Sequence, residues 1–106
     1  MADIKNILFI MCDQLRADYL SCAGHPTLET PNIDALAGRG VRFDRAYTQS
    51  PVCGPSRMSF YTGRYVISHG ATWNGVPLDV AEWTMGDYLR PLGKRCVLVG
   101  KTHMAA

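Results

Sequence analysis

The sequence predicts an α/β fold with a largely parallel sheet flanked by helices. Two uninterrupted apolar runs, residues 7–12 and 96–99, are typical of strands that are buried on both faces. Between them lie segments with helical spacing of apolar residues and with recognisable start and stop residues. Strands that alternate with helices along a chain of 106 residues favour the α/β class.

Two helices are expected in the first part of the chain. A short one covers residues 15–20. The next begins where Thr30 can act as N-cap and Pro31 can take the first helical position. Gly38 and Gly40 then end it, because glycine readily adopts the conformation that closes a helix.

A strand, a rigid loop and a third helix are expected in the middle of the chain. Partial alternation of apolar and polar residues predicts a strand at residues 41–47. Two prolines and a glycine within residues 50–55 predict a loop. A helix then runs from about Pro55 to Gly63, and a second loop covers residues 69–78.

The last part contains a helix and the second buried strand. Thr84 can cap the helix, with Asp87 in a capping-box position, and Gly93 ends it. The strand at residues 96–99 follows directly. An α/β domain would end awkwardly just after this strand, so we expect residues 1–106 to be the N-terminal part of a domain that continues beyond Ala106.

Composition and charge exclude several classes of protein. The chain is 47% hydrophobic and 19% charged, which is unlike a disordered chain. A formal charge of +2 gives no reason to expect nucleic acid or a membrane surface as partner, and no apolar run is long enough to span a bilayer. The first apolar run ends at Asp13 without the features of a signal peptide, so a cytoplasmic location is expected. The four cysteines have neither disulfide-framework nor zinc-type spacing.

Polar residues follow both apolar runs, where α/β proteins place their sites. Asp13 and Gln14 come directly after the first run, and Lys101 and His103 come after the last. Asp13 and Gln14 offer oxygen ligands for a hard cation such as Ca²⁺ or Mg²⁺, although Asp13 could equally cap a turn.

Residues 53–57, which read Cys-Gly-Pro-Ser-Arg, lead into the third helix. Cys53 could be a buried free thiol. It could also be a thiolate nucleophile whose pKa is lowered by the helix N-terminus. Cysteine phosphatases, however, place five residues between cysteine and arginine, whereas three lie between Cys53 and Arg57.

Four motifs in order resemble the type I sulfatases of the alkaline phosphatase superfamily. Residues 53–57 resemble the sulfatase signature C-x-P-S-R, with Cys53, Pro55 and Arg57 in the positions that the modifying enzyme reads. In addition to this signature, the four motifs are similar to the family's first strand with its metal-binding Asp, its "TPNLD-L" helix, its "-SLLTGR" helix and its "GK-H" sulfate-binding element. In this sequence they are residues 6–14, 30–37, 59–64 and 100–103.

The resemblance implies an alkaline phosphatase-like fold and a sulfuric ester hydrolase. Cys53 would be converted to formylglycine through a transient encounter with formylglycine-generating enzyme. Its hydrated form would attack a small-molecule sulfate ester with one hydroxyl and expel sulfate with the other. Arg57 would neutralise the nucleophile's oxygens, and Lys101 and His103 would hold the sulfuryl group.

The implied metal ligands are Asp13, Gln14 and position 53, with Ca²⁺ expected and Mn²⁺ or Mg²⁺ as alternatives. Many arylsulfatases have a second Asp where this chain has Gln14, and Asp-Gln resembles the choline sulfatase and phosphonate monoester hydrolase branch. Phosphonate monoester hydrolases lack the Lys-x-His element, so Lys101 and His103 favour sulfate esters. A phosphonate or phosphodiester hydrolase, and a non-catalytic anion-binding module, stay as alternatives. The sequence does not indicate an oligomeric state.

Overall fold

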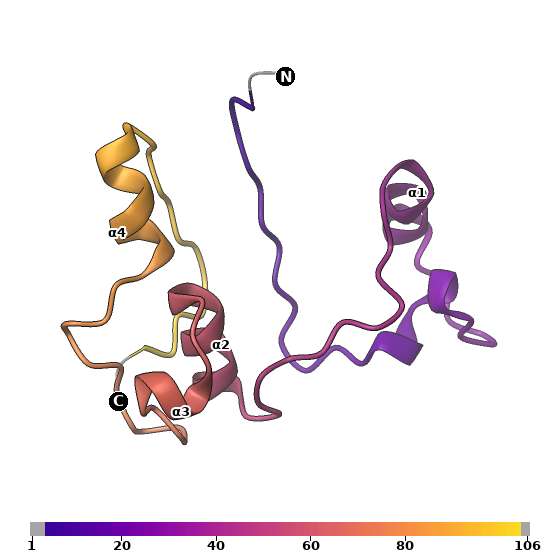
Figure 1. Ribbon diagram of the computed structural model, residues 1–106. Helices are drawn as coiled ribbons and strands as arrows, with labels where there is room; N and C mark the ends of the chain where they lie inside the picture. The colour runs from indigo at the N-terminus through magenta and orange to yellow at the C-terminus, as the bar shows by residue number, and fades with distance from the viewer. Residues whose placement is uncertain (1–3, 105–106) are drawn as a thin grey trace. The chain divides into compact units, whose positions relative to one another are not determined.

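The computed structural model describes residues 4–104, and their regular structure is helical (Figure 1). They divide into two compact units, one that ends at Asp44 and one that begins at Arg45. Four α-helices and three short 3-10 helices lie within this described part: η1 (Ala17–Tyr19), η2 (Ser21–Ala23), α1 (Pro31–Arg39), α2 (Cys53–Thr62), α3 (Val66–His69), α4 (Met85–Leu89) and η3 (Arg90–Leu92).

In the first unit, a hydrogen-bonded carboxylate ties η2 to α1. Asp34 in α1 accepts hydrogen bonds from the Ser21 hydroxyl at 2.5 Å, the Cys22 backbone N–H at 2.9 Å and the Thr30 hydroxyl at 2.9 Å. These donors, the Ser21 hydroxyl first, lower the pKa of Asp34 below its ordinary value because they stabilise the charged form. Thr30 therefore occupies the N-cap position as expected, but its side chain serves Asp34 and makes no cap hydrogen bond.

The start of α1 and its end at Gly40 follow the sequence prediction, whereas Gly38, which was also expected to stop the helix, lies inside it. Pro31 takes the first turn, where its missing N–H costs nothing, and Gly40 closes the helix. The helix expected at residues 15–20 is different, because the chain forms the 3-10 turns η1 and η2 there, and Gly24 ends η2 with φ 94°.

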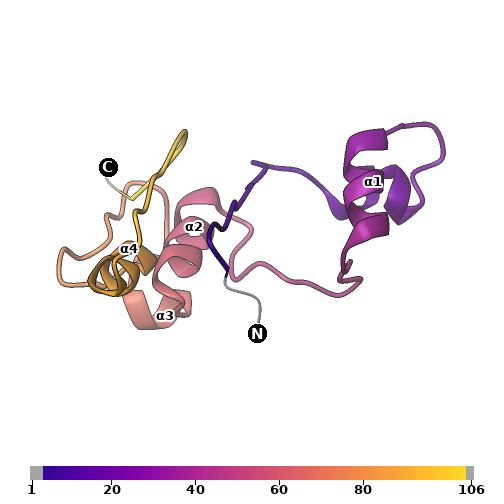
Figure 2. The ribbon, with the colours of Figure 1, turned by 90° about the horizontal axis from the view of Figure 1, so that it is seen from above.

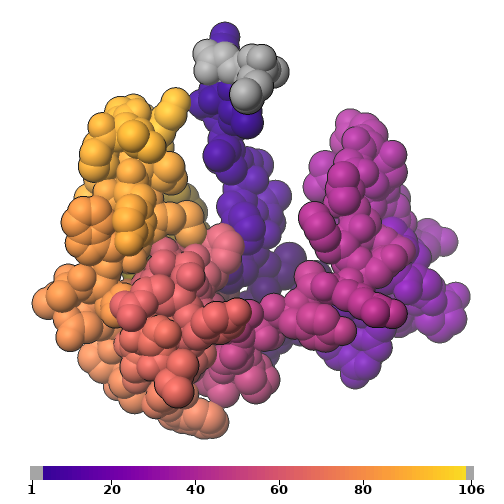
Figure 3. All heavy atoms as spheres, in the orientation of Figure 1, coloured from indigo at the N-terminus to yellow at the C-terminus, as the bar shows by residue number. Residues whose placement is uncertain are grey.

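In the second unit, α2 and α3 lie side by side in both ribbon views (Figures 1 and 2). Met58, Tyr61 and Ala71 form the buried apolar centre of the described residues, and Pro55 is also fully buried. In the space-filling view the atoms of these helices pack directly against one another (Figure 3). The most buried part of the unit is therefore the helix that carries Cys53.

The helix expected after Thr84 is confirmed. The Asp87 carboxylate accepts hydrogen bonds from the Thr84 backbone N–H at 2.9 Å and from its hydroxyl at 2.8 Å. These bonds lower the pKa of Asp87, the backbone N–H contributing most. The 3-10 helix η3 extends α4 by one turn, and Gly93 closes it with φ 71°.

No β-strand is present among residues 4–104, so the expected strands at 7–12, 41–47 and 96–99 are not formed there. Residues 7–12 run as an extended segment, a narrow column of indigo atoms in Figure 3. Ile7 is 82% exposed and Val99 is 88% exposed. A parallel strand needs hydrogen-bonding neighbours on both edges and cover on both faces, and these segments do not pair with one another. The parallel sheet therefore stays a prediction.

No disulfide joins the four cysteines, all of which lie in the described residues: Cys12, Cys22, Cys53 and Cys96. Among residues 4–104, the helices are too short and too polar to cross a membrane.

Candidate active site

Cys53 is the first residue of α2, two positions earlier than the sequence predicted the helix to begin. Val52 has extended dihedral angles (φ −93°, ψ 132°) and serves as N-cap without a side-chain cap. Pro55 is tolerated at this position because an N–H in the first turn of a helix would have no intrahelical acceptor, so proline loses no hydrogen bond there. The Ser56 N–H donates to the Val52 carbonyl at 3.0 Å, which closes the first turn. Position 53 thus lies at the end of the helix where the backbone dipoles favour negative charge.

Asn74, on the loop that follows α3, caps this helix from outside. Its Oδ1 accepts a hydrogen bond from the Gly54 N–H at 2.9 Å, and its Nδ2 donates to the Cys53 Sγ at 3.3 Å. A Cβ on Gly54 would lie 2.7 Å from Oδ1, so glycine is needed for this approach. The sequence holds no signal for the contact of Asn74 with Cys53.

Arg57 lies one helical turn after Cys53 and is only 7% exposed. Its Nη1 donates a hydrogen bond to the Lys101 carbonyl at 2.8 Å. The same segment is held further on, where the Leu78 N–H donates to the Met104 carbonyl at 3.1 Å. The signature helix is therefore joined to the segment that carries Lys101 and His103 by a direct hydrogen bond, and the loop at Leu78 holds the same segment by another.

Two predicted site residues have strained backbones. Among the described residues, Gln14 (φ 56°) and His103 (φ 57°) are the non-glycine residues in the left-handed region. Residues with side chains avoid this region, and strain of this kind gathers at functional sites. Nδ1 of His103 is also buried without a hydrogen-bond partner in the described part of the chain. A buried polar nitrogen without a partner indicates that another group completes this site.

Asp13 and Gln14 lie in the first unit, and both are exposed. Their carboxylate and amide oxygens are ligands of the kind that hard cations prefer. Within residues 4–104, no group of three or more His, Cys, Asp or Glu side chains could hold a metal ion. Asp13 and Gln14 are too few to form a complete metal shell by themselves.

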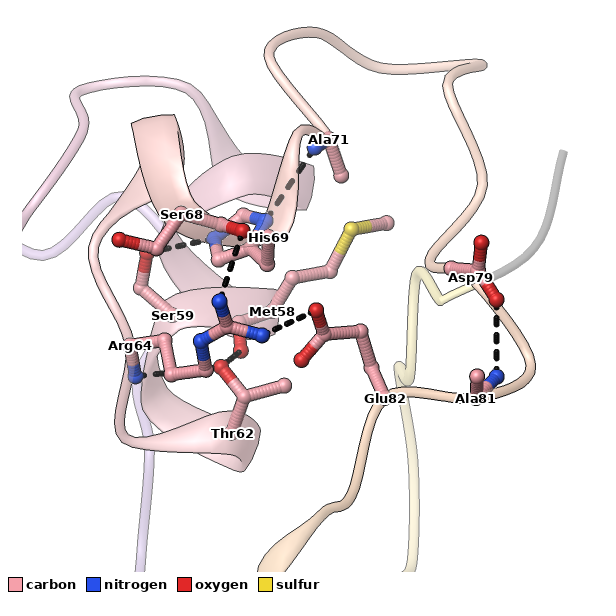
Figure 4. A network of polar contacts seen from close by, with 10 residues as sticks. All are labelled: Met58, Ser59, Thr62, Arg64, Ser68, His69, Ala71, Asp79, Ala81 and Glu82. Carbon is pink, nitrogen blue, oxygen red and sulfur yellow. Dashed lines mark hydrogen bonds and ion pairs between the residues drawn. The ribbon is translucent and has the colours of Figure 1, made fainter.

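His69, at the start of the loop that the sequence predicted, is buried at 6% exposure. Its Nε2 lies 2.9 Å from the Ser59 Oγ, and its Nδ1 accepts a hydrogen bond from the Ala71 N–H at 3.2 Å (Figure 4). The helix α3, which ends at His69, was not predicted. The one feature of the sequence that could have indicated the end of this helix was Gly70, which closes it in a left-handed conformation with φ 73°.

A hollow of about 500 Å³ lies on the same unit, away from the signature. Two of the charged side chains that line the hollow, Arg64 and Glu82, form an ion pair with each other. None of the predicted site residues is among those that line it: Arg64, Ile67, Ser68, His69, Gly70, Asp79, Ala81, Glu82, Trp83 and Tyr88. Chemistry is therefore assigned to the N-terminus of α2 and not to this hollow.

The family model for sulfatases matches residues 5–106. The chain therefore belongs to the sulfatase family, as its four motifs predicted. Its likeness to individual members agrees with this.

Two curated relatives illustrate the likeness. The multifunctional alkaline phosphatase superfamily protein PehA of Trinickia caryophylli is 40% identical over 103 residues, which cover 92% of this chain and 20% of that protein. Human steryl-sulfatase is 38% identical over 116 residues, covering 97% and 20%. The chain spans about a fifth of the length of these relatives.

A solved structure extends the likeness to three dimensions. The phosphonate monoester hydrolase of Agrobacterium radiobacter has 41% sequence identity and a TM-score of 0.72, over 76% of this chain and 16% of that chain. This supports the alkaline phosphatase-like fold that the sequence predicted.

Proposed function

We propose that this chain supplies the nucleophile and the sulfate-binding residues of a sulfuric ester hydrolase. The observation that carries the proposal is the signature at residues 53–57, with Cys53 on the first turn of α2 and Arg57 bonded to the Lys101 segment. Relatives five times as long support residues 1–106 as the N-terminal part of a sulfatase catalytic domain, with the rest of that domain beyond Ala106.

The surroundings of position 53 suit a formylglycine nucleophile made from Cys53 by formylglycine-generating enzyme. When hydrated, formylglycine would supply two hydroxyls: one as the nucleophile toward sulfur, with its proton passing to the departing alcohol, and one whose deprotonation would release sulfate and restore the aldehyde. The Asn74 amide would donate to an oxygen at position 53 as it now donates to sulfur. Arg57 and the positive end of α2 favour the negative charge that builds up there.

Lys101 and His103 would hold the sulfuryl oxygens. The Lys101 side chain is exposed and carries a positive charge that suits an anionic ester. The unpartnered Nδ1 of His103 supports the same role, because a sulfuryl oxygen would give this nitrogen the hydrogen bond that it lacks.

Asp13 and Gln14 would bind a divalent cation, for which Ca²⁺ is the first candidate and Mn²⁺ or Mg²⁺ are alternatives. When bound, such a cation favours deprotonation of the nucleophile by its positive charge. The strained backbone of Gln14 supports a binding role, since a turn alone would not require a non-glycine residue at φ 56°.

A phosphonate monoester hydrolase is the second candidate. The 41% identity to the Agrobacterium radiobacter enzyme and the Asp13-Gln14 pair favour it. The same nucleophile and charges could serve a phosphonate, so the two functions differ in how the anionic group is held.

Rates on matched esters separate the two functions. The full-length protein is produced together with formylglycine-generating enzyme, and the peptide that contains Cys53 is examined by mass spectrometry. We expect conversion at Cys53 and a higher kcat/KM for an aryl sulfate than for the matching aryl phosphonate monoester. The opposite order would establish the second candidate.

Two variants test the nucleophile. Cys53→Ala should abolish turnover of the aryl sulfate. Cys96→Ala removes an exposed thiol outside the signature and should leave turnover unchanged. Undiminished activity in Cys53→Ala, or an unmodified thiol in fully active native protein, would overturn the proposal.

A further inference from the structure

The loop between α3 and Asn74 is fastened to α2 at two points, and His69 provides one of them. At one end, His69 contacts Ser59 in α2. At the other, Asn74 contacts Gly54 and Cys53 in the first turn of the same helix. Residues 70–73 separate the two points, so little free chain lies between them.

The hydrogen bonds of His69 define its tautomer. Because Nδ1 accepts the Ala71 N–H, the proton of the neutral ring is on Nε2 and is donated to the Ser59 Oγ. Ser59 is 5% exposed and Ala71 is fully buried, so both bonds are shielded from water. A shielded bond of this kind is costly to leave unmade.

The residue before His69 is fixed from a second direction. Arg64 donates through Nη2 to the Ser68 carbonyl at 3.0 Å and also pairs with Glu82 (Figure 4). Met58, fully buried in α2, packs within the same cluster. The end of α3 that carries the imidazole is therefore held by Arg64 as well as by Ser59.

We propose that His69 is a positioning residue for the nucleophile: by joining Ser59 to the Ala71 backbone, it holds the loop so that Asn74 reaches position 53. This inference rests on the proposed function for its catalytic consequence. The positioning itself depends only on the described contacts.

The test compares substitutions that each keep one of the two bonds. His69→Asn places an amide oxygen near the position of Nδ1 and can still accept the Ala71 N–H. His69→Gln reaches toward Ser59 and loses the bond to Ala71. His69→Ala loses both, and His25→Ala, in an exposed loop of the first unit, is the control for loss of a histidine.

Backbone hydrogen exchange in the full-length protein measures how firmly the loop is positioned, without reference to activity. We expect faster exchange at residues 70–74 and at the Gly54 N–H in His69→Ala, a smaller increase in His69→Asn and in His69→Gln, each of which keeps one bond, and normal exchange in His25→Ala. Unchanged exchange in His69→Ala would overturn the proposal. If His69→Ala does not fold, Ser59→Ala weakens the same link and is expected to speed exchange at the same sites.

Steady-state kinetics measure how this positioning affects catalysis. With Cys53 conversion matched by mass spectrometry, His69→Ala should lower kcat of the folded protein by about 10-fold to 10²-fold, with a smaller change in KM. In an Asn74→Ala background the same substitution should have little further effect, because the contact it positions is already gone. Equal losses in both backgrounds would refute the route through Asn74. A wild-type protein that is converted but inactive would refute the proposed function, while hydrogen exchange would still decide the positioning.

Discussion

Gly54→Ala should slow catalysis while it leaves the modification signature intact. The added Cβ would lie 2.7 Å from the Asn74 Oδ1, whereas ordinary contacts begin at 3.4 Å. The amide must therefore retreat and give up its 2.9 Å hydrogen bond from the Gly54 N–H. Losing that bond costs about 1 kcal/mol, which corresponds to about 5-fold. Displacing a group beside the nucleophile can cost up to about 10²-fold, so we expect kcat to fall between these limits.

The assay is kcat for an aryl sulfate, measured on full-length protein with Cys53 conversion quantified by mass spectrometry. Gly38→Ala is the matched control: it lies within α1 with open space around it, so activity should not change and stability should rise by up to about 1 kcal/mol. Wild-type kcat in converted Gly54→Ala would refute the reasoning. So would an equal loss in an Asn74→Ala background, where no amide remains to be displaced.

Three further substitutions test the rest of the proposed site and the first unit. Lys101→Ala should lower kcat/KM by roughly 10²-fold, because it removes the side-chain charge but keeps the carbonyl that Arg57 binds; a loss of thermal stability with normal kinetics would contradict this role. Asp13→Ala should abolish metal-dependent turnover, measured before and after chelation and calcium addition; unchanged activity with the metal removed would reject the assignment. Asp34→Asn should lower the urea midpoint above about pH 5, and the difference from wild type should shrink as the pH falls below about 4. The depressed pKa of Asp34 sets that sign, because its contribution is lost when the folded carboxylate is protonated, and a difference independent of pH would disprove it.

The sequence determined those features that depend on neighbouring residues. Pro31 and Gly40 bound α1, Asp87 holds Thr84 at the start of α4, and Gly63 ends α2, each as local backbone preferences predict. The signature from Cys53 to Arg57 and its order with the other motifs were also readable, and the match to the sulfatase family agrees with them. Capping, turn chemistry and motif spacing act over a few residues, so the linear order contains them.

The tertiary structure decided what depends on residues far apart. The contact of Asn74 with Gly54 spans 20 positions, and that of Arg57 with the Lys101 carbonyl spans 44. His69 was predicted only as the start of a loop, because a single histidine carries no periodic signal, yet a buried hydroxyl on the neighbouring helix gives it a partner. The apolar run at residues 7–12 is a prediction that local composition made and the tertiary structure does not show. Its composition favours a strand, but a strand needs paired neighbours, which a local pattern cannot supply. Local preferences are settled within a turn of chain, whereas hydrogen bonds between distant segments form only where packing brings them together.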